Sequence, residues 1–117
     1  MRPERVNLLD LVQNLISEYT FLAKASNVSL GLEAKEDLPA NNWEIFADSK
    51  RIKLAIENLI DNAIRYTRGG GFVKIRLKNE NKSIRCEVED NGAGVPKKEQ
   101  KYIFQKFFRG QNIMKYQ

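Results

Sequence analysis

The sequence predicts an α+β fold, a two-layer sandwich in which helices cover one face of a mixed, mainly antiparallel sheet. Residues 7–26 and 49–67 repeat apolar side chains at helical spacing. Shorter segments alternate apolar and polar residues, as strands do when one face lies in a core and the other in solvent. A doubly wound parallel sheet would instead show continuous apolar runs. These two patterns favour helices packed on one side of an antiparallel sheet.

The first half of the chain contains one helix and two strands. The helix over residues 7–26 places its apolar side chains on one face, and Asn27 is suited to end it. Residues 28–33 alternate apolar and polar side chains, which predicts a half-buried strand. A loop over residues 35–42 then leads to a short strand over residues 43–47.

The second half opens on the most regular helix of the sequence. Asp48 or Ser49 caps this helix, which we expect to run to about Thr67, before Arg68 and three glycines end it. Its buried stripe is expected to consist of Ile52, Ala55, Ile56, Leu59, Ile60 and Ala63.

A hairpin follows, with residues 79–82 joining two alternating strands over residues 73–77 and 84–88. Cys86 alternates inward, which predicts a buried and unreactive thiol. On the outer face, basic side chains of one strand oppose acidic side chains of the other, a pattern that favours cross-strand ion pairs. The side chains concerned are Lys74, Arg76 and Lys78 on the first strand and Glu87 and Glu89 on the second.

The composition excludes several classes of function. The 117 residues include no histidine and one cysteine, which excludes histidine-based zinc sites, histidine-dependent nucleophiles, an internal disulfide and a histidine that accepts phosphate. Charges interrupt every apolar run well short of the about 18 residues of a membrane span. The start of the chain does not resemble a signal peptide, so we expect a cytoplasmic location.

The net charge of +5 is unevenly distributed. Residues 1–49 hold four basic and eight acidic side chains, whereas residues 50–117 hold sixteen basic and seven acidic ones. A basic half fits an anionic partner, such as nucleic acid, a phosphorylated ligand or an acidic protein surface. On charge alone, a solvated lysine-rich surface is the simpler explanation.

The second helix carries a polar strip beside its apolar face. At about 100° per residue, Asn58, Asn62 and Arg65 fall on one side. Asparagine is a mediocre helix former, so these residues are either tolerated at a surface or kept for a function. Asparagine amide oxygens ligate a hard cation such as Mg²⁺ without adding charge, and an arginine one turn on contacts a phosphate. The strip alone leaves both explanations open.

Two further segments each allow more than one interpretation. Residues 90–94 (Asp-Asn-Gly-Ala-Gly) follow a strand and suit a simple turn, or a site where glycines admit a flat ligand and Asp90 accepts from an exocyclic amine. Residues 103–109 interleave aromatic and basic side chains, as in a core helix with a solvated rim, a base-stacking surface or a partner contact. Phe107 and Phe108 cannot both enter one core from a regular helix, which favours a contact role for one of them.

Three segments together resemble motifs of the catalytic ATP-binding domain of bacterial sensor histidine kinases, in the GHKL ATPase superfamily. Residues 58–67 (Asn-Leu-Ile-Asp-Asn-Ala-Ile-Arg-Tyr-Thr) resemble the asparagine box, residues 90–95 the first glycine box and residues 103–109 the phenylalanine box. They follow the family order, with 28 residues from Asn62 to Asp90. The resemblance covers essentially the whole chain and implies one domain of the GHKL sandwich type.

The resemblance implies ATP and Mg²⁺ as cofactors, together with roles for the residues of the asparagine box. By this likeness, Asn62 ligates Mg²⁺ and Asn58 lies beside the triphosphate. Arg65 and Tyr66 lie along the phosphate and ribose side. Hydrolytic members of the superfamily carry a glutamate at the place of Asn58, and an amide cannot take a proton from water. The kinase branch is therefore favoured, with transfer to a supplied nucleophile.

The other two boxes imply an adenine pocket and a partner contact. Asp90 binds the adenine amine in this interpretation, and Gly92 and Gly94 shape the pocket around the base. The phenylalanine box contacts the histidine-bearing dimerisation domain of the kinase. The residues expected to make that contact are Phe104, Phe107, Phe108 and Arg109.

The same comparison predicts an incomplete domain. The family's second glycine box, Gly-x-Gly-Leu-Gly-Leu or similar, has no counterpart, nor do the acceptor histidine, the final helix and the closing strands. We therefore expect an inactive fragment that binds ATP weakly at best, and an open sheet edge that favours homodimers or strand exchange. The parent kinase, soluble or membrane-anchored, would pass its phosphoryl group to a response regulator.

Two other functions are compatible with parts of the sequence. The first is a non-catalytic protein-interaction module derived from the same fold, docking through the phenylalanine segment. The second is a nucleic-acid binder that uses the basic second half. Nucleic-acid binding leaves Asn58, Asn62 and Asp90 unexplained, so we expect no nucleic-acid partner.

Overall fold

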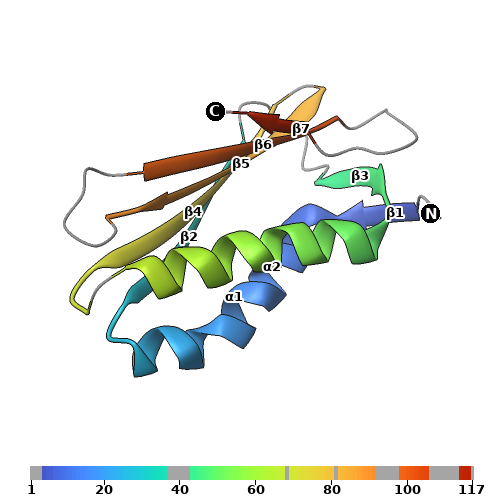
Figure 1. The fold of residues 1–117 in the computed structure, drawn as a ribbon. Helices are drawn as coiled ribbons and strands as arrows, with labels where there is room; N and C mark the ends of the chain where they lie inside the picture. The colour runs from blue at the N-terminus through green and yellow to red at the C-terminus, as the bar shows by residue number, and fades with distance from the viewer. Residues whose placement is uncertain are drawn as a thin grey trace.

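Two helices pack beneath one face of a five-stranded sheet, and a separate two-stranded sheet lies at the end where both helices begin (Figure 1). This arrangement confirms the predicted α+β two-layer sandwich. The part of the chain that this computed structural model describes consists of residues 4–36, 43–67, 69–80, 82–91, 98–105 and 114–116.

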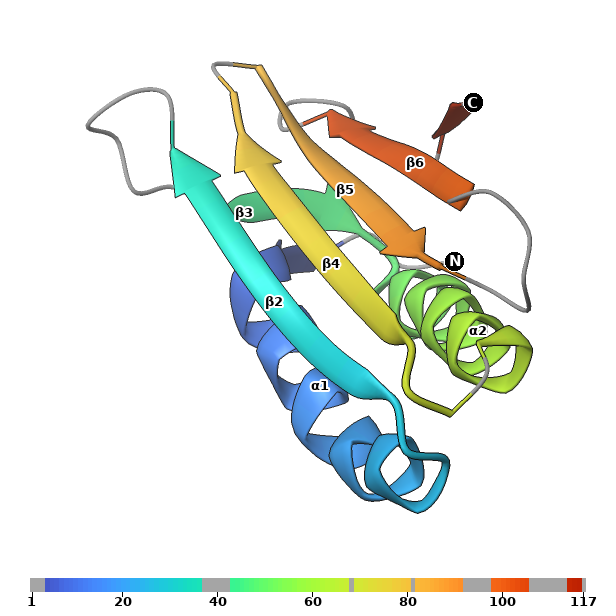
Figure 2. The ribbon, with the colours of Figure 1, turned by 90° about the vertical axis from the view of Figure 1, so that its left-hand side faces the viewer.

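The five-stranded sheet is mixed and mainly antiparallel, in the order β2-β4-β5-β6-β7 (Figure 2). β2 (Ser29–Glu36) runs parallel to β4 (Phe72–Asn79), because the chain crosses from one to the other through β3 and α2. β4 forms an antiparallel pair with β5 (Ser83–Asp90), which confirms the predicted hairpin. β5 pairs with β6 (Lys98–Gln105), and β6 with β7 (Met114–Tyr116), both antiparallel.

Both helices begin at a side-chain cap. α1 (Leu8–Ala25) follows Asn7, whose side chain accepts a hydrogen bond from a main-chain N–H of the first turn. α2 (Ser49–Tyr66) follows Asp48, whose carboxylate accepts from two such groups. Caps of this kind satisfy N–H groups that have no partner within the helix. In the described part of the chain, neither helix is long and apolar enough to cross a bilayer.

The turns after the two helices bring β2 and β4 together. Asn27 adopts a positive φ of 55° just beyond α1, in keeping with its predicted place at the helix end. Its carbonyl oxygen accepts from the Gly70 N–H at 2.7 Å, and the Ser29 N–H donates to the Gly71 carbonyl oxygen at 3.0 Å. Gly70 has a φ of 90°, a conformation that favours glycine. The two parallel strands therefore start side by side.

The core lies between the helices and the inner face of the sheet. Cys86 is fully buried there, and burial raises the pKa of its thiol to about 12, as the prediction of an unreactive thiol requires. The largest fully buried side chains are Phe104, Leu8, Leu15, Ile45, Ile52, Ile56, Ile60, Ile64, Ile75, Leu77, Ile84 and Val12.

Strand structure extends beyond the prediction at the beginning of the chain. β1 (Glu4–Asn7) pairs antiparallel with β3 (Glu44–Ala47) and was not expected. β2 continues to Glu36, through two residues that were assigned to the loop over 35–42. Hydrogen bonds to β4 along the whole length of β2 outweigh the polar character of those residues.

The aromatic segment also differs from expectation. Residues up to Gln105 form β6 rather than a helix, and the Phe104 ring is fully buried. β6 pairs with β5, and among the described strands β2 and β7 form the edges of the sheet. Phe104 packs edge-on against Tyr102, with ring centroids 6.3 Å apart. It thus lies in the core rather than at a surface for a partner.

Candidate functional site

The polar strip of α2 is exposed along one side of the helix. Asn58, Asn62 and Tyr66 follow one another at intervals of one turn, and all three side chains face solvent. Tyr66 is 71% exposed, the behaviour of a side chain that has no packing role in this conformation. Two amides and a phenol are thus available on one surface. Their placement fits the predicted strip.

Arg65, the third residue of the predicted strip, pairs with an acidic neighbour. Its Nε donates to Oδ2 of Asp61 at 2.8 Å, an ion pair between residues one turn apart. The hydrogen bond to Asp61 raises the pKa of Arg65, and the attraction between the two charges adds to it. The pKa of Tyr19 on α1 is raised first by burial and then by the charge of Asp61. Only Nε of Arg65 is engaged in the pair with Asp61, and the guanidinium group has further N–H donors.

Asp90 is the last residue of β5, half-buried and opposite Val73 of β4 and Lys98 of β6. α2 packs against β4 and β5, and the end of β5 lies at the same end of the molecule as the last turns of α2 (Figures 1 and 2). Asp90 therefore lies at the end of the molecule where the last turns of α2 carry Asn62 and Tyr66.

Asn91 holds the end of β5 in place. Its Oδ1 accepts from the Phe72 N–H at 2.8 Å, and its own N–H donates to the Phe72 carbonyl oxygen at 3.4 Å. The residue that follows Asp90 is thus held to β4 by two hydrogen bonds. No pattern within the local sequence predicts this contact, because its partner lies 19 residues away.

Several predicted site residues lie outside the described part of the chain. Among residues that the structure does describe, Asn58, Asn62, Arg65 and Tyr66 are exposed on α2, Asp90 ends β5, and Phe104 lies in the core. The predicted residues outside the described ranges are Gly92, Gly94, Phe107, Phe108 and Arg109.

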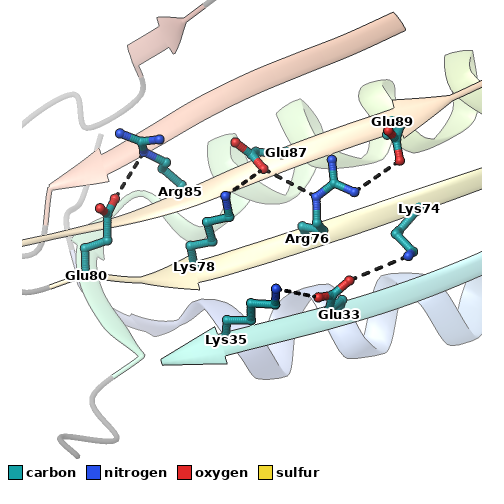
Figure 3. Close-up of polar contacts among 9 residues, drawn as sticks. All are labelled: Glu33, Lys35, Lys74, Arg76, Lys78, Glu80, Arg85, Glu87 and Glu89. Atoms are coloured by element: carbon teal, nitrogen blue, oxygen red, sulfur yellow. Dashed lines mark hydrogen bonds and ion pairs between the residues drawn. The ribbon is translucent and has the colours of Figure 1, made fainter. Parts of the chain in front are cut away.

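The outer face of the sheet carries the predicted cross-strand ion pairs (Figure 3). Arg76 lies between two glutamates, with Nε 3.4 Å from Glu87 and Nη1 3.1 Å from Glu89. Lys78 reaches Glu87 at 3.5 Å. Burial acts to lower the pKa of Arg76, but the hydrogen bonds that Arg76 donates to the two glutamates, and the attraction of their charges, outweigh it and the pKa is raised. This network ties β4 to β5 on the face opposite the helices.

Neither of two surface hollows includes a predicted site residue. One, of about 380 Å³, lies between α1 and α2 beside Leu11, Glu18 and Lys53. The other, of about 340 Å³, lies over Gly31 and Phe72 on the outer face of the sheet. Within the described ranges, no group of three or more histidine, cysteine, aspartate or glutamate residues could hold a metal ion.

Comparison with known proteins adds a family to this geometry. The profile described as "Histidine kinase-, DNA gyrase B-, and HSP90-like ATPase" matches residues 47–117. The adaptive-response sensory kinase SasA of Rippkaea orientalis is 33% identical over 100 residues, which are 85% of this chain and 25% of that protein. SasA of Synechocystis is 32% identical over 103 residues, or 87% of this chain and 26% of that protein. The chain spans about a quarter of the length of these relatives.

Solved structures agree with the sequence comparisons. The catalytic domain of histidine kinase ThkA superposes with a TM-score of 0.70 at 25% identity, over 82% of this chain and 60% of that one. ThkA in complex with the response regulator TrrA gives a TM-score of 0.68 at 24% identity, over 80% of this chain and 27% of that one. The helices and the mixed sheet therefore form the fold of a histidine kinase catalytic domain.

Proposed function

We propose a function from the family to which the chain belongs, the histidine kinase-, DNA gyrase B- and HSP90-like ATPases, in which it is a catalytic domain of the sensor histidine kinase type. In this proposal the chain binds Mg-ATP and supplies the γ-phosphoryl group to a histidine on another domain. One observation carries the proposal. The exposed amide of Asn62, in the last turns of α2, and Asp90, at the end of β5, lie toward the same end of the sandwich, with the exposed amide of Asn58 one turn before Asn62, on segments that resemble the family's nucleotide-binding boxes.

The donor set around Asn62 fits a metal ion that arrives with a nucleotide. Among the described residues no group of three or more acidic, histidine or cysteine side chains could hold a metal ion, so the exposed amide of Asn62 would contribute one neutral oxygen ligand. Mg²⁺ prefers six oxygen ligands and takes many of them from phosphates and water in nucleotide sites. Mg²⁺ bound there would neutralise charge on the phosphates. Arg65 would add a cation through the N–H groups that do not bond to Asp61.

Asp90 suits recognition of the adenine base. A carboxylate at the end of a central strand, half-buried and followed by the fixed point at Asn91, is held in a defined place. Accepting a hydrogen bond from the exocyclic amine of adenine contributes about 1.5–3 kcal/mol. Tyr66, exposed on α2, would lie along the ribose and phosphate side.

The side chains favour phosphoryl transfer over hydrolysis. Asn58 is an amide and cannot act as the general base for an attacking water. Catalysis of phosphoryl transfer depends mainly on positioning and charge stabilisation, so a supplied nucleophile is sufficient. This chain has no histidine, so the acceptor belongs to the dimerisation domain of the kinase, and a response regulator receives the phosphoryl group next. We place these steps in the cytoplasm.

A titration of the 117-residue chain with ATP, followed by amide chemical shifts, tests the proposal. The shift method detects millimolar affinities, which suits the weak binding expected. We expect Asp90→Ala to weaken ATP binding about ten- to a hundredfold. Asn62→Ala should abolish the part of the affinity that Mg²⁺ adds, with little effect in EDTA.

Three results would contradict the proposed function. The first is no shift with ATP at millimolar concentration, which would favour a non-catalytic interaction module of the same fold. The second is equal affinity of wild type and Asp90→Ala. The third is a loss in Asn62→Ala that is the same with and without Mg²⁺. A suitable control is Asn14→Ala, an exposed asparagine on α1 that should not change the affinity.

A further inference from the structure

The end of β5 is held to β4 by a side chain that replaces a main-chain acceptor. Asn91 donates its N–H to the Phe72 carbonyl oxygen, and the Phe72 N–H donates to Asn91 Oδ1 at 2.8 Å. In an antiparallel pair, facing residues normally exchange both hydrogen bonds through their main chains. Here the side-chain oxygen of Asn91 occupies the place of its own carbonyl oxygen.

This exchange of acceptors explains why β5 ends at Asp90. The pair Val73 and Asp90 is the last in the register of β4 and β5. With its N–H satisfied by a side chain, Phe72 does not need the carbonyl group of Asn91, so β5 ends while its last contact with β4 stays closed. Asparagine makes local bonds of this kind, whereas an apolar residue cannot. The Asn91 side chain is exposed, so core packing does not account for it.

We propose that Asn91 is a positioning residue, which clamps the end of β5 to Phe72 and thereby orients the Asp90 carboxylate toward the exocyclic amine of adenine. The inference rests on the proposed function. Asn91 itself needs no contact with the nucleotide. Without this acceptor, the exposed Phe72 N–H bonds to water, so a single hydrogen bond holds residue 91 to Phe72 and the chain next to Asp90 is less firmly oriented.

The ratio of ATP affinity to ITP affinity measures the Asp90 contact alone. ITP carries a carbonyl group where ATP carries the exocyclic amine, and the two triphosphates are identical. Changes in phosphate binding or net charge therefore cancel in the ratio. The assay titrates the full 117-residue chain with each nucleotide in Mg²⁺ and follows amide shifts. Exchange of the Phe72 amide proton with solvent, measured without nucleotide, reports the clamp itself.

We expect Asn91→Ala to lower the ATP-to-ITP ratio about three- to tenfold, the loss of one hydrogen bond. Asn91→Gln keeps the amide but misplaces it by one methylene group, so the ratio should fall to a similar extent. Asn91→Asp keeps the Oδ acceptor and should preserve the ratio. Exchange of the Phe72 amide proton should accelerate in the alanine and glutamine variants only. Asn14→Ala is the control, with wild-type ratio and exchange.

The outcomes separate this inference from the function on which it rests. If Asp90→Ala abolishes the ATP preference while Asn91→Ala and Asn91→Gln keep it, the positioning role is refuted and the function stands. The positioning role is also refuted if Asn91→Asp loses the preference as fully as Asn91→Ala. If one variant does not fold, the other decides. If the wild type has no preference, or Asp90→Ala retains one, both the adenine contact and the inference fall.

Discussion

Replacing Arg76 by alanine is expected to destabilise the fold strongly, because two nearly buried carboxylates lose a shared cation. The Glu87 and Glu89 side chains are only 5% and 7% exposed, so water cannot replace the guanidinium group. Removing one partner of a buried ion pair typically costs about 3–5 kcal/mol. Glu87 keeps Lys78 at 3.5 Å, which places the expected loss in free energy of unfolding near the lower end, about 3 kcal/mol.

Urea unfolding measures this loss directly. Trp43 is the only tryptophan and is buried, so its fluorescence reports unfolding without an added label. Arg85→Ala is the matched control, since Arg85 pairs with Glu80 at 3.1 Å on the same hairpin, but the two side chains are 39% and 36% exposed. An exposed pair of this kind contributes at most about 1 kcal/mol.

A double variant separates two causes of the loss, the glutamate charge that no longer faces Arg76 and the packing of the Arg76 side chain. Glu89→Gln added to Arg76→Ala removes one of the two carboxylates that lose Arg76, so we expect it to recover about 1–2 kcal/mol of the loss. Equal destabilisation by Arg76→Ala and Arg85→Ala would refute the reasoning. The reasoning would also be refuted if the double variant lost as much stability as the sum of what Arg76→Ala and Glu89→Gln lose separately, because Arg76 and Glu89 would then act independently.

Three further predictions concern the cap of α2, the core thiol and the outer sheet face. Asp48→Ala should lower the free energy of unfolding in urea by about 1 kcal/mol, while Asp48→Asn, which keeps an acceptor, should lose little; equal losses would contradict a capping role. Cys86, with its pKa raised to about 12, should not react with a thiol reagent at about pH 8 until urea unfolds the chain, and rapid labelling of the folded chain would disprove its burial. A hydrogen bond from Lys35, aided by attraction to the charge of Lys35, lowers the pKa of Glu33 below 4.5. The contribution of ionised Glu33 to stability is therefore present above pH 4.5 and is lost as the pH falls through the lowered pKa. Glu33→Gln should therefore flatten the decline of Tm in that acid range, and an unchanged decline would argue against the ion pair.

Local patterns predicted the elements that hold the site. The periodic stripe and the capping side chain of α2 both act within a few residues, so its bounds follow closely from the sequence. The β4–β5 hairpin was equally predictable, because apolar residues alternate along both strands and opposite charges face each other on the outer side. The same local pattern contained the ion pair of Asp61 and Arg65, an acid and a base one turn apart, although Arg65 was expected to contact a phosphate.

Features that depend on distant partners were not predictable. β1 has four residues with only Val6 buried, so no alternation marks it, and its pairing with β3 decides its structure. The sequence of residues 98–105 is compatible with either a helix or a strand. Pairing with β5 makes this segment the strand β6. The burial of Phe104 follows from that pairing. The contact of Asn91 with Phe72 likewise exists only once the hairpin has formed.

A crystal structure of this chain with Mg²⁺ and a non-hydrolysable ATP analogue tests the central claim most directly. We predict that the exocyclic amine of adenine lies within hydrogen-bonding distance of the Asp90 carboxylate. The metal ion should lie between the phosphates and the amide oxygen of Asn62. An adenine ring bound away from the end of β5, or a metal ion with phosphates remote from Asn62, would contradict the assignment of this site.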